Sequence, residues 1–581
     1  MLRSVLSSLD VRHTGTATRE RAAEGRPEQG RPPRLLLGVA AAAALLGLVM
    51  WLAGSGVLAL WSLAISAGVL AWALPLPYAL ASVLFLGVLG WLVDMLPIVT
   101  LAGWGSVCAR WVVGLVREKR LPRGGRMVWI PTALFLWTIL GITAITAQDL
   151  RHFLLLLAMQ GAFTVTILMV IDALADPADR LRLIVALVSF VVLMTVGVFA
   201  EWVGVPVQEL QDSSVSGAVE NAYGLDAFPN SLKMIKYVNS RTSGARKLRN
   251  ELRNSAGAHE EVANAAVFKP KFQSFRTMLV VRFAGSARHL EDELERFDIS
   301  LVYDNVGLAP AHTVPRMRSF PRNSLTYAST CVAVLPLAFV LVWTTGGIRR
   351  RLGYVGIAAC LFGIGFSLAR GAWMAAALGV LYIMVFGPVS RRRKGFMAGA
   401  FAVGALVLIG TFLVKYGLEP ATARAEGKGS INTRATVYQE TVASVEGIEF
   451  LTGFGTEEPR GKGGVSHLLG RYVPKAGSHS TYLNFLFRAG VPGALGIVAI
   501  YVLAGLRAHS AGRSGSGDER IVAALLGAAL VSLAAHAAIQ NVFVEPTYAL
   551  VVAAVLGMGL AVSPNLKGLL PRRGRSEGPA S

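Results

Sequence analysis

Charged residues are scarce in this sequence of 581 residues, at 16%, whereas 54% of the residues are hydrophobic. Soluble domains carry about 25% charged residues, so most of this chain is unsuited to a surface that faces water. The chain has three cysteines and no CxxC pair, which argues against a disulfide framework and against a zinc site. No Walker loop, kinase motif set, HExxH pair or nucleophile elbow is present, so ATP-driven transport and metalloprotease activity have no support.

The sequence instead contains a series of apolar runs close to 20 residues long, the length that crosses ~30 Å of hydrocarbon as a helix. Backbone groups inside lipid must satisfy one another, so these runs are predicted to be helices. The predicted spans are 35–54, 56–74, 77–96, 98–116, 128–147, 152–173, 181–200, 326–345, 352–369, 372–388, 396–415, 482–506, 521–540 and 547–563. The expected fold is an all-α polytopic membrane protein with about 12–14 transmembrane helices and two long extracytoplasmic segments.

The formal net charge of +21 is interpreted as a topology signal and not as a nucleic-acid-binding surface, because the basic residues cluster in short loops and tails. With the N-terminus inside, every cluster falls on the cytoplasmic side of the predicted spans. The clusters are Arg117/Lys119/Arg120/Arg123/Arg126, Arg349/Arg350/Arg351, Arg391/Arg392/Arg393/Lys394, Arg507/Arg513/Arg520 and Arg572/Arg573/Arg575. The same count places two long polar segments outside, where we expect the protein to do its work.

The predicted organisation follows from this count. It consists of a cytoplasmic basic tail (1–34), N-terminal transmembrane helices (35–200), an extracytoplasmic insertion (201–325), central transmembrane helices (326–415), an extracytoplasmic catalytic loop (416–480), C-terminal transmembrane helices (481–565) and a cytoplasmic tail (566–581). Within the insertion, the pattern around Ser286–Phe297 predicts a helix.

Four polar elements fall on the predicted outer side. They are Arg316–Leu325, which runs into a span; Ser367–Trp373, between two spans; Ser430–Arg434, followed by Gly453-Phe-Gly455; and His479–Asn484, followed by Arg488–Gly493. Single elements have ordinary explanations, since an arginine at the membrane surface can extend its charge toward lipid headgroups. Arg370 is different, because a charge between two apolar spans is costly and is usually functional.

In combination, these elements resemble the O-antigen ligase/polymerase superfamily, which includes O-antigen ligases, Wzy-type polymerases and protein O-oligosaccharyltransferases. The resemblance covers residues 310–565, and its most specific parts are the Ser367-Leu-Ala-Arg-Gly-Ala-Trp373 and His479-Ser-Thr-Tyr-Leu-Asn484 blocks. The insertion at 201–325 departs from the family. So does Pro-Arg-Asn323, which leaves open whether Arg316 or Arg318 takes the place of the family arginine.

The resemblance implies a glycosyltransferase that uses an undecaprenyl-diphosphate-linked glycan as donor, without a metal or cofactor, at the periplasmic face of a bacterial inner membrane. Lipopolysaccharide or another polysaccharide would be the product, and the acceptor would be a hydroxyl of a glycan, of lipid A core or of a protein. Membrane lipid surrounds the spans, both termini are cytoplasmic, and nucleic acid is not an expected partner. The implied catalytic residues are His479, Arg370 and Arg434, and the implied substrate-binding residues are Arg316, Arg318, Asn323, Tyr482 and Asn484.

Several alternatives stay open at this point. Ligase, polymerase and protein-glycosylating activities differ in their acceptor, which this pattern does not identify. A lipid-linked glycan flippase is a second class, disfavoured because transporters place polar groups at mid-membrane, whereas the polar set here lies at the outer face. A non-catalytic scaffold of a polysaccharide assembly complex is a third.

Overall fold

The computed structural model describes the helices and strands of the chain together with short connections between them. The described ranges are 34–52, 56–92, 96–138, 150–174, 176–202, 232–238, 262–268, 277–283, 301–302, 324–367, 369–416, parts of 438–454, 480–541 and 546–562. They fall into two compact units. The first comprises Met1–Val198, Pro321–Leu408 and Lys428–Ser581, and the second comprises Phe199–Phe320 and Ile409–Gly427.

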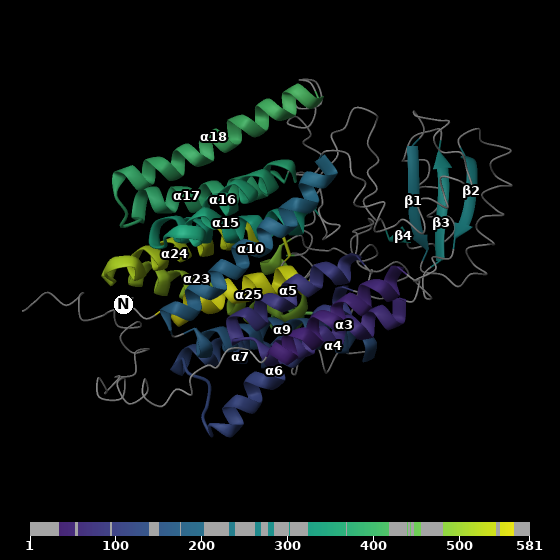
Figure 1. Cartoon of the computed structure of the whole chain (residues 1–581), viewed down its shortest axis with the longest axis horizontal. Coiled ribbons are helices and arrows are strands. Elements are labelled where there is room, and N and C mark those ends of the chain that lie inside the picture. The colour runs from purple at the N-terminus through teal and green to yellow at the C-terminus, as the bar shows by residue number, and fades with distance from the viewer. Residues whose placement is uncertain are drawn as a thin grey trace, which may run out of the picture. The chain divides into compact units, whose positions relative to one another are not determined.

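The first unit is a bundle of long helices that lie side by side (Figure 1). Its main helices are α3 (Arg34–Leu52), α4 (Gly56–Ala73), α5 (Leu76–Leu92), α6 (Leu96–Arg117), α7 (Trp129–Phe135), α9 (Leu150–Ala173), α10 (Pro177–Trp202), α15 (Ser324–Thr344), α16 (Gly347–Phe366), α17 (Arg370–Phe386), α18 (Arg391–Tyr416), α23 (Thr481–Ser514), α24 (Gly517–Ala537) and α25 (Pro546–Ala561). Each apolar run predicted from the sequence coincides with one of these helices, and α7 lies within the described part of the run at 128–147.

Among the described residues, five helices are long and apolar enough to cross a membrane, namely α10, α15, α18, α23 and α24. Shorter apolar helices occur in six further places, including α17 and α25. The prediction of an all-α polytopic membrane protein is therefore confirmed for the helical unit.

Helix α15 lies at the centre of the bundle and packs against α16, α17, α24 and α25. Nearly all of its residues are buried, whereas hardly any residue of α18 is buried. Helix α18 meets the bundle through single large side chains, such as Phe396 against Phe339 of α15, with ring centroids 6.2 Å apart. Its outward residues Val403, Leu406 and Val407 are exposed, and an apolar surface of this kind suits lipid better than water.

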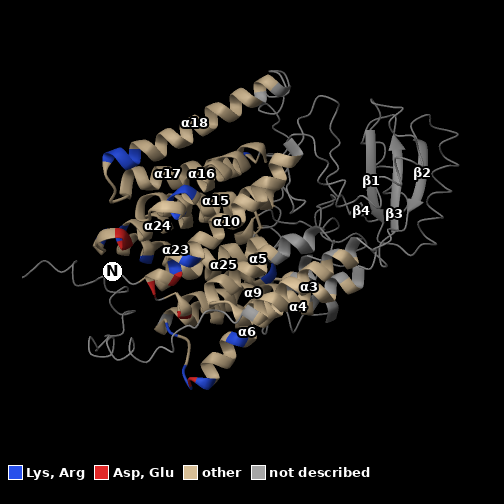
Figure 2. Ribbon diagram, in the orientation of Figure 1, with Lys and Arg blue, Asp and Glu red and all other residues tan. Residues whose placement is uncertain are grey.

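Lys and Arg residues of the bundle gather toward one end, at the left in Figure 2. The starts of α16 and α18 carry two of the predicted basic clusters, and the Arg393 guanidinium lies 5.9 Å from the ring centroid of Trp343 at the end of α15. Basic residues at one end of a helical bundle are what the positive-inside rule leads us to expect.

A buried carboxylate holds the first basic loop against this end of the bundle. Asp172 of α9 accepts hydrogen bonds from the Arg120 guanidinium at 2.6 Å, the Arg123 backbone amide at 2.7 Å and the Trp111 indole at 2.9 Å. The bond to Asp172 raises the pKa of Arg120 above its ordinary value. Three donors on one carboxylate offset the cost of burying its charge.

The second unit contains a four-stranded antiparallel sheet that was not predicted from the sequence. Its strands are β1 (Leu232–Val238), β2 (Val262–Phe268), β3 (Thr277–Phe283) and β4 (Leu301–Val302), in the spatial order β2-β3-β1-β4. Strands β1 and β2 both run antiparallel to β3, and β4 runs antiparallel to β1.

These directions make β1 parallel to β2 and β3 parallel to β4, so each pair needs a crossover connection. The connecting residues 239–261 and 284–300 are each longer than the dozen that a crossover requires. Strand order and directions are those of the split βαβ arrangement known as ferredoxin-like. The helix predicted around Ser286–Phe297 lies outside the described residues.

Candidate functional site

The end of α24, defined as residues 534–540, is a point where segments far apart in the sequence meet. Helix α17 reaches it with its second residue: a methyl group added to Gly371 would lie 1.8 Å from the Cδ1 atom of Ile539. An alanine at position 371 would therefore require the Ile539 side chain to shift, and this close contact sets the start of α17, with Arg370, beside the end of α24.

The turn that precedes α17 is closed by its own serine. The Ser367 hydroxyl donates to the Ile364 carbonyl at 2.8 Å and accepts from the Ala369 amide at 3.3 Å. Arg370 then opens α17 and is exposed. Three positions later, Trp373 packs edge-on against Phe401 of α18, at 5.9 Å between ring centroids. The local structure holds the arginine at a bundle end, where its guanidinium does not enter the apolar core.

Helix α23 also begins against the end of α24. Ser480, the residue after His479 in the chain, caps α23 by accepting the Leu483 amide at 3.4 Å. The Thr481 hydroxyl donates to the Gln540 carbonyl at 2.8 Å, and the Tyr482 hydroxyl donates to the Ala534 carbonyl at 2.9 Å. Carbonyls at a helix end have no partner within the helix, so these hydroxyls supply the missing hydrogen bonds.

The long loop before α23 reaches the same place. The Tyr438 hydroxyl donates to the Ala538 carbonyl at 3.0 Å, and Tyr438 follows Arg434 by four residues. The end of α24 therefore contacts Gly371, beside Arg370; Tyr438, four residues after Arg434; and Thr481, two residues after His479.

A second contact between α23 and the long loop lies further along α23, where the helix is broken at Ala489 and Gly490. Gly453 and Gly490 have φ angles of +65° and +64° and pack backbone against backbone. The Phe454 amide donates to the Phe487 carbonyl at 2.7 Å, and the Trp137 indole donates to the Ala489 carbonyl at 3.1 Å. These contacts lock the loop and the first half of α23 into one body.

Three of the eight predicted site residues are described by the structure. Arg370 is exposed at the start of α17, Tyr482 is half-buried with its hydroxyl bound to α24, and Asn484 is half-buried in the first turn of α23. The other five, His479, Arg434, Arg316, Arg318 and Asn323, lie outside the described residues.

Sequence reasoning missed two polar residues of this site. His536 is buried in α24, and Gln540 is buried three residues beyond the end of that helix. A histidine and a glutamine in an otherwise apolar run are a signal that could have found them. Within the described ranges, no group of three or more His, Cys, Asp or Glu residues could hold a metal ion.

In a comparison with protein families, the O-antigen ligase family matches residues 355–498. A search of curated proteins found none that matches the chain. The matched segment contains Arg370, Arg434, His479, Tyr482 and Asn484 and stops short of Arg316 on the N-terminal side. The match confirms the resemblance found in the sequence motifs, over a segment of about a quarter of the chain.

Proposed function

We propose that this protein transfers a glycan from a polyprenyl diphosphate carrier to an acceptor hydroxyl, at the periplasmic face of a bacterial inner membrane. One observation carries the proposal. In or near the segment that matches the O-antigen ligase family, three residues pack on the end of α24: Gly371, beside Arg370; Tyr438, four residues after Arg434; and Thr481, two residues after His479. This common anchor supports the proposal that the three functional groups act together.

The arginines suit a diphosphate leaving group. Breaking the bond between a sugar and its diphosphate builds negative charge on the phosphate oxygens, and a guanidinium stabilises that charge by bidentate hydrogen bonds. We assign this role to Arg370 and Arg434, together with Arg316 or Arg318. Asn323, Tyr482 and Asn484 are proposed to contact substrate.

His479 is proposed to act on the acceptor. Its imidazole takes the proton from the acceptor hydroxyl while that oxygen attacks the anomeric carbon, and the bond from carbon to the diphosphate oxygen breaks. The electron pair leaves with the diphosphate, and the proton is released from imidazole to water. Because one displacement occurs at the anomeric carbon, the reaction inverts its configuration. A general base of this kind contributes about 10²–10⁴ in rate.

The proposal is tested by deleting the gene and examining lipopolysaccharide on a gel. Loss of all long glycan from lipid A core, with polymer still on the carrier lipid, identifies a ligase, and a single repeat unit on the core identifies a polymerase. A normal ladder would exclude both, leaving protein glycosylation to be examined with a glycoprotein stain.

Complementation then tests the assigned residues. We expect Arg370→Ala and His479→Ala to fail to restore glycan. The matched controls Arg392→Ala, in a basic cluster at the other end of the bundle, and His509→Ala, bound to Tyr382 at 2.8 Å, should restore it. Rescue by both Arg370→Ala and His479→Ala would end the assignment.

The shared location is tested by labelling. In a chain whose three native cysteines are replaced by alanine, we expect cysteines at positions 370 and 479 to react with a membrane-impermeant thiol reagent added from the periplasm. A cysteine at position 350 should react only after the membrane is opened. Reaction of 370 and 479 from opposite sides would refute a common site.

A further inference from the structure

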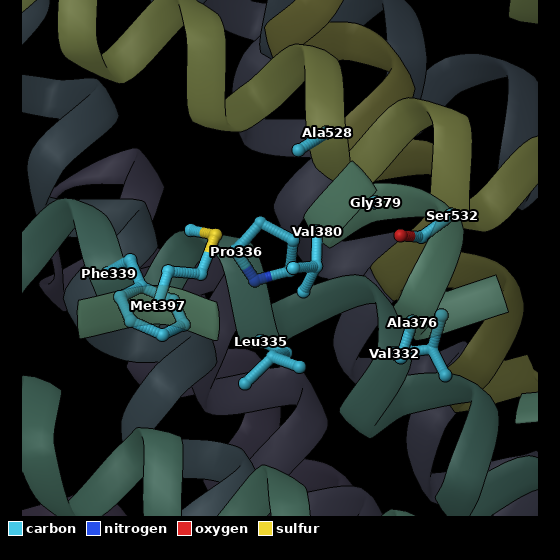
Figure 3. A pocket seen from close by; sticks show the side chains of 10 residues that line it. All are labelled: Val332, Leu335, Pro336, Phe339, Ala376, Gly379, Val380, Met397, Ala528 and Ser532. Atoms are coloured by element: carbon cyan, nitrogen blue, oxygen red, sulfur yellow. The ribbon is translucent and has the colours of Figure 1, made fainter. Parts of the chain in front are cut away.

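The cavity among α15, α17, α18 and α24 is too small to bind a substrate. Its volume is about 10 Å³, and Ser532 is the one polar residue in a lining that includes Val332, Phe339 and Met397 (Figure 3). A space of this size holds at most one water molecule. The second unit, with its four-stranded sheet, offers a binding surface of a different kind.

The register of the sheet assigns its residues to two faces, because alternate residues of a strand belong to opposite faces and paired residues belong to the same face. The first, called the apolar face, comprises Leu232, Met234, Lys236, Val238, Val262, Ala265, Val267, Thr277, Leu279, Val281, Phe283 and Leu301. The second, called the mixed face, comprises Lys233, Ile235, Tyr237, Asn264, Ala266, Phe268, Met278, Val280, Arg282 and Val302.

The topology of the strands leaves the mixed face open. Crossovers between parallel strands of one sheet are right-handed in nearly all proteins. The step from β1 to β2 and the step from β3 to β4 start on strands of opposite direction and cross the sheet in opposite senses. Right-handed crossovers therefore belong on the same face for both steps. Since packed elements cover the more apolar face of a sheet, we expect both on the apolar face, which leaves neither over the mixed face.

A row of polar residues, called the cationic row, crosses the mixed face. Lys233 of β1 is directly opposite Arg282 of β3, and Arg282 is directly opposite Asn264 of β2. Like charges in directly opposite positions destabilise a sheet, and an anion bound over them would offset this cost. The four strands contain no acidic residue, since all eight Asp and Glu residues of 232–302 occur in the connections 239–261 and 284–300.

A second row, called the aromatic row, crosses the mixed face nearer the other end of the strands. Tyr237 of β1 is opposite Met278 of β3, and Met278 is opposite Phe268 of β2. An aromatic ring offers a flat apolar surface that suits the C–H face of a sugar ring. Tyr237 follows Lys233 by four residues, roughly 13 Å at the rise of a β-strand. A ligand that reaches both rows is therefore longer than one sugar.

We propose that the mixed face binds an acidic oligosaccharide, with acidic groups on the cationic row and sugar rings on the aromatic row. Arginine binds a carboxylate or phosphate by two parallel hydrogen bonds, and lysine binds it as a point charge. This inference rests on the proposed function, since the ligand is the glycan that the protein transfers, and it identifies that glycan as acidic.

An anionic membrane surface is the other partner to consider. Segments that bind anionic lipids carry clusters of about four to eight Lys and Arg residues, whereas the mixed face has two, Lys233 and Arg282. The separation of the cationic and aromatic rows along the strands also suits a chain of sugars better than a plane of headgroups. The experiment below includes lipid binding as an outcome.

Binding is measured with the full-length protein in nanodiscs of phosphatidylcholine. The probes are hexagalacturonate, which is acidic, and maltohexaose, a neutral chain of the same length. We expect hexagalacturonate to bind more tightly, and its advantage to shrink as salt is raised. Lys233→Gln and Arg282→Gln should each weaken its binding roughly tenfold, the effect of losing one hydrogen bond to a charged group. Lys236→Gln, the matched control, removes the same charge from the apolar face of the same strand and should leave binding unchanged.

Stability distinguishes a binding role from a structural one. Because Lys233 and Arg282 carry like charges in opposite positions, Lys233→Gln should not lower the unfolding midpoint of the unit that contains the sheet, measured by calorimetry without probe. A lower midpoint with a proportionate loss of binding would overturn the proposal. Equal affinities of the parent, Lys233→Gln and Arg282→Gln for hexagalacturonate, or equal affinities of the parent for the two probes, would overturn it as well.

Nanodiscs of phosphatidylglycerol test the alternative partner. If hexagalacturonate binds as tightly there as in phosphatidylcholine, the mixed face is free for the glycan beside an anionic membrane, as we expect. If binding disappears only in phosphatidylglycerol, the mixed face takes lipid headgroups and the proposal is wrong.

The outcome is separable from that of the proposed function. If Arg370→Ala abolishes glycan output while Lys233→Gln and Arg282→Gln bind hexagalacturonate as the parent does, only the inference about the mixed face fails. If Arg370→Ala and His479→Ala both retain output, the proposed function fails, and the binding measurement still decides whether the sheet holds an acidic glycan.

Discussion

Replacing Gly490 with alanine is expected to separate the long loop from α23. Gly490 has φ +64° and ψ −169°, a region of backbone space that only glycine occupies readily. A Cβ atom there would also lie 2.4 Å from the Leu451 carbonyl oxygen, which belongs to the backbone and cannot turn away. Backbone strain and steric conflict together cost about 2–6 kcal/mol.

The measurement is thermal unfolding of the purified protein in detergent, with glycan transfer assayed in parallel. We expect Gly490→Ala to lower the unfolding midpoint and to reduce transfer by more than the loss of folded protein explains, because the first half of α23 carries the residues after His479. Gly505→Ala is the matched control, since it lies on the same helix with open space around it, and it should leave both readouts unchanged.

A double variant sharpens the test, because Gly453 contributes the other half of the contact, with φ +65° and a Cβ position 2.5 Å from the Ala489 amide nitrogen. Once one substitution has opened the contact, the second costs only its backbone strain. The combined loss of stability should therefore be smaller than the sum of the single losses. Equal stability of Gly490→Ala and Gly505→Ala, or strict additivity of the pair, would refute this reasoning.

Further predictions concern three other features. Gly371→Ala should reduce transfer by displacing the start of α17 from Ile539, and the added change Ile539→Ala should restore it; no rescue in a transfer assay would contradict the contact. Asp172→Asn should destabilise the first basic loop by about 1.5–3 kcal/mol, as expected for loss of hydrogen bonds to a charged group, and limited proteolysis should then cut at residues 117–126 faster than in the parent protein. Replacing residues 232–302 with a flexible linker should leave the unfolding midpoint of the helical unit unchanged, because the sheet belongs to a separate compact unit; a large drop in calorimetry would show that the two units depend on each other.

The helices of this protein could be predicted from local sequence, because the length and apolarity needed to cross a bilayer are properties of each segment alone. The basic clusters beside these apolar runs predicted that Lys and Arg lie at one end of the helices. In the structure, the Lys and Arg residues of the bundle gather toward one end. Arg370 could be singled out in the same way, since a charge between two apolar runs stands out from its neighbours. The sheet could not be predicted, because strand pairing joins residues such as Leu232 and Phe283 that are far apart in the chain.

Only tertiary structure decided what surrounds the candidate site. The contacts between Gly371 and Ile539, Gly453 and Gly490, and Thr481 and Gln540 join segments of different helices and loops, and each depends on the packing of the whole bundle. Because burial also depends on the packing of the whole bundle, the sequence alone does not show that Gln540, at the end of an apolar run, is more buried than an ordinary polar residue after a helix. Its unpaired amide oxygen becomes apparent only in the folded structure, where the residue is buried and lacks the partners that an exposed side chain would find in water.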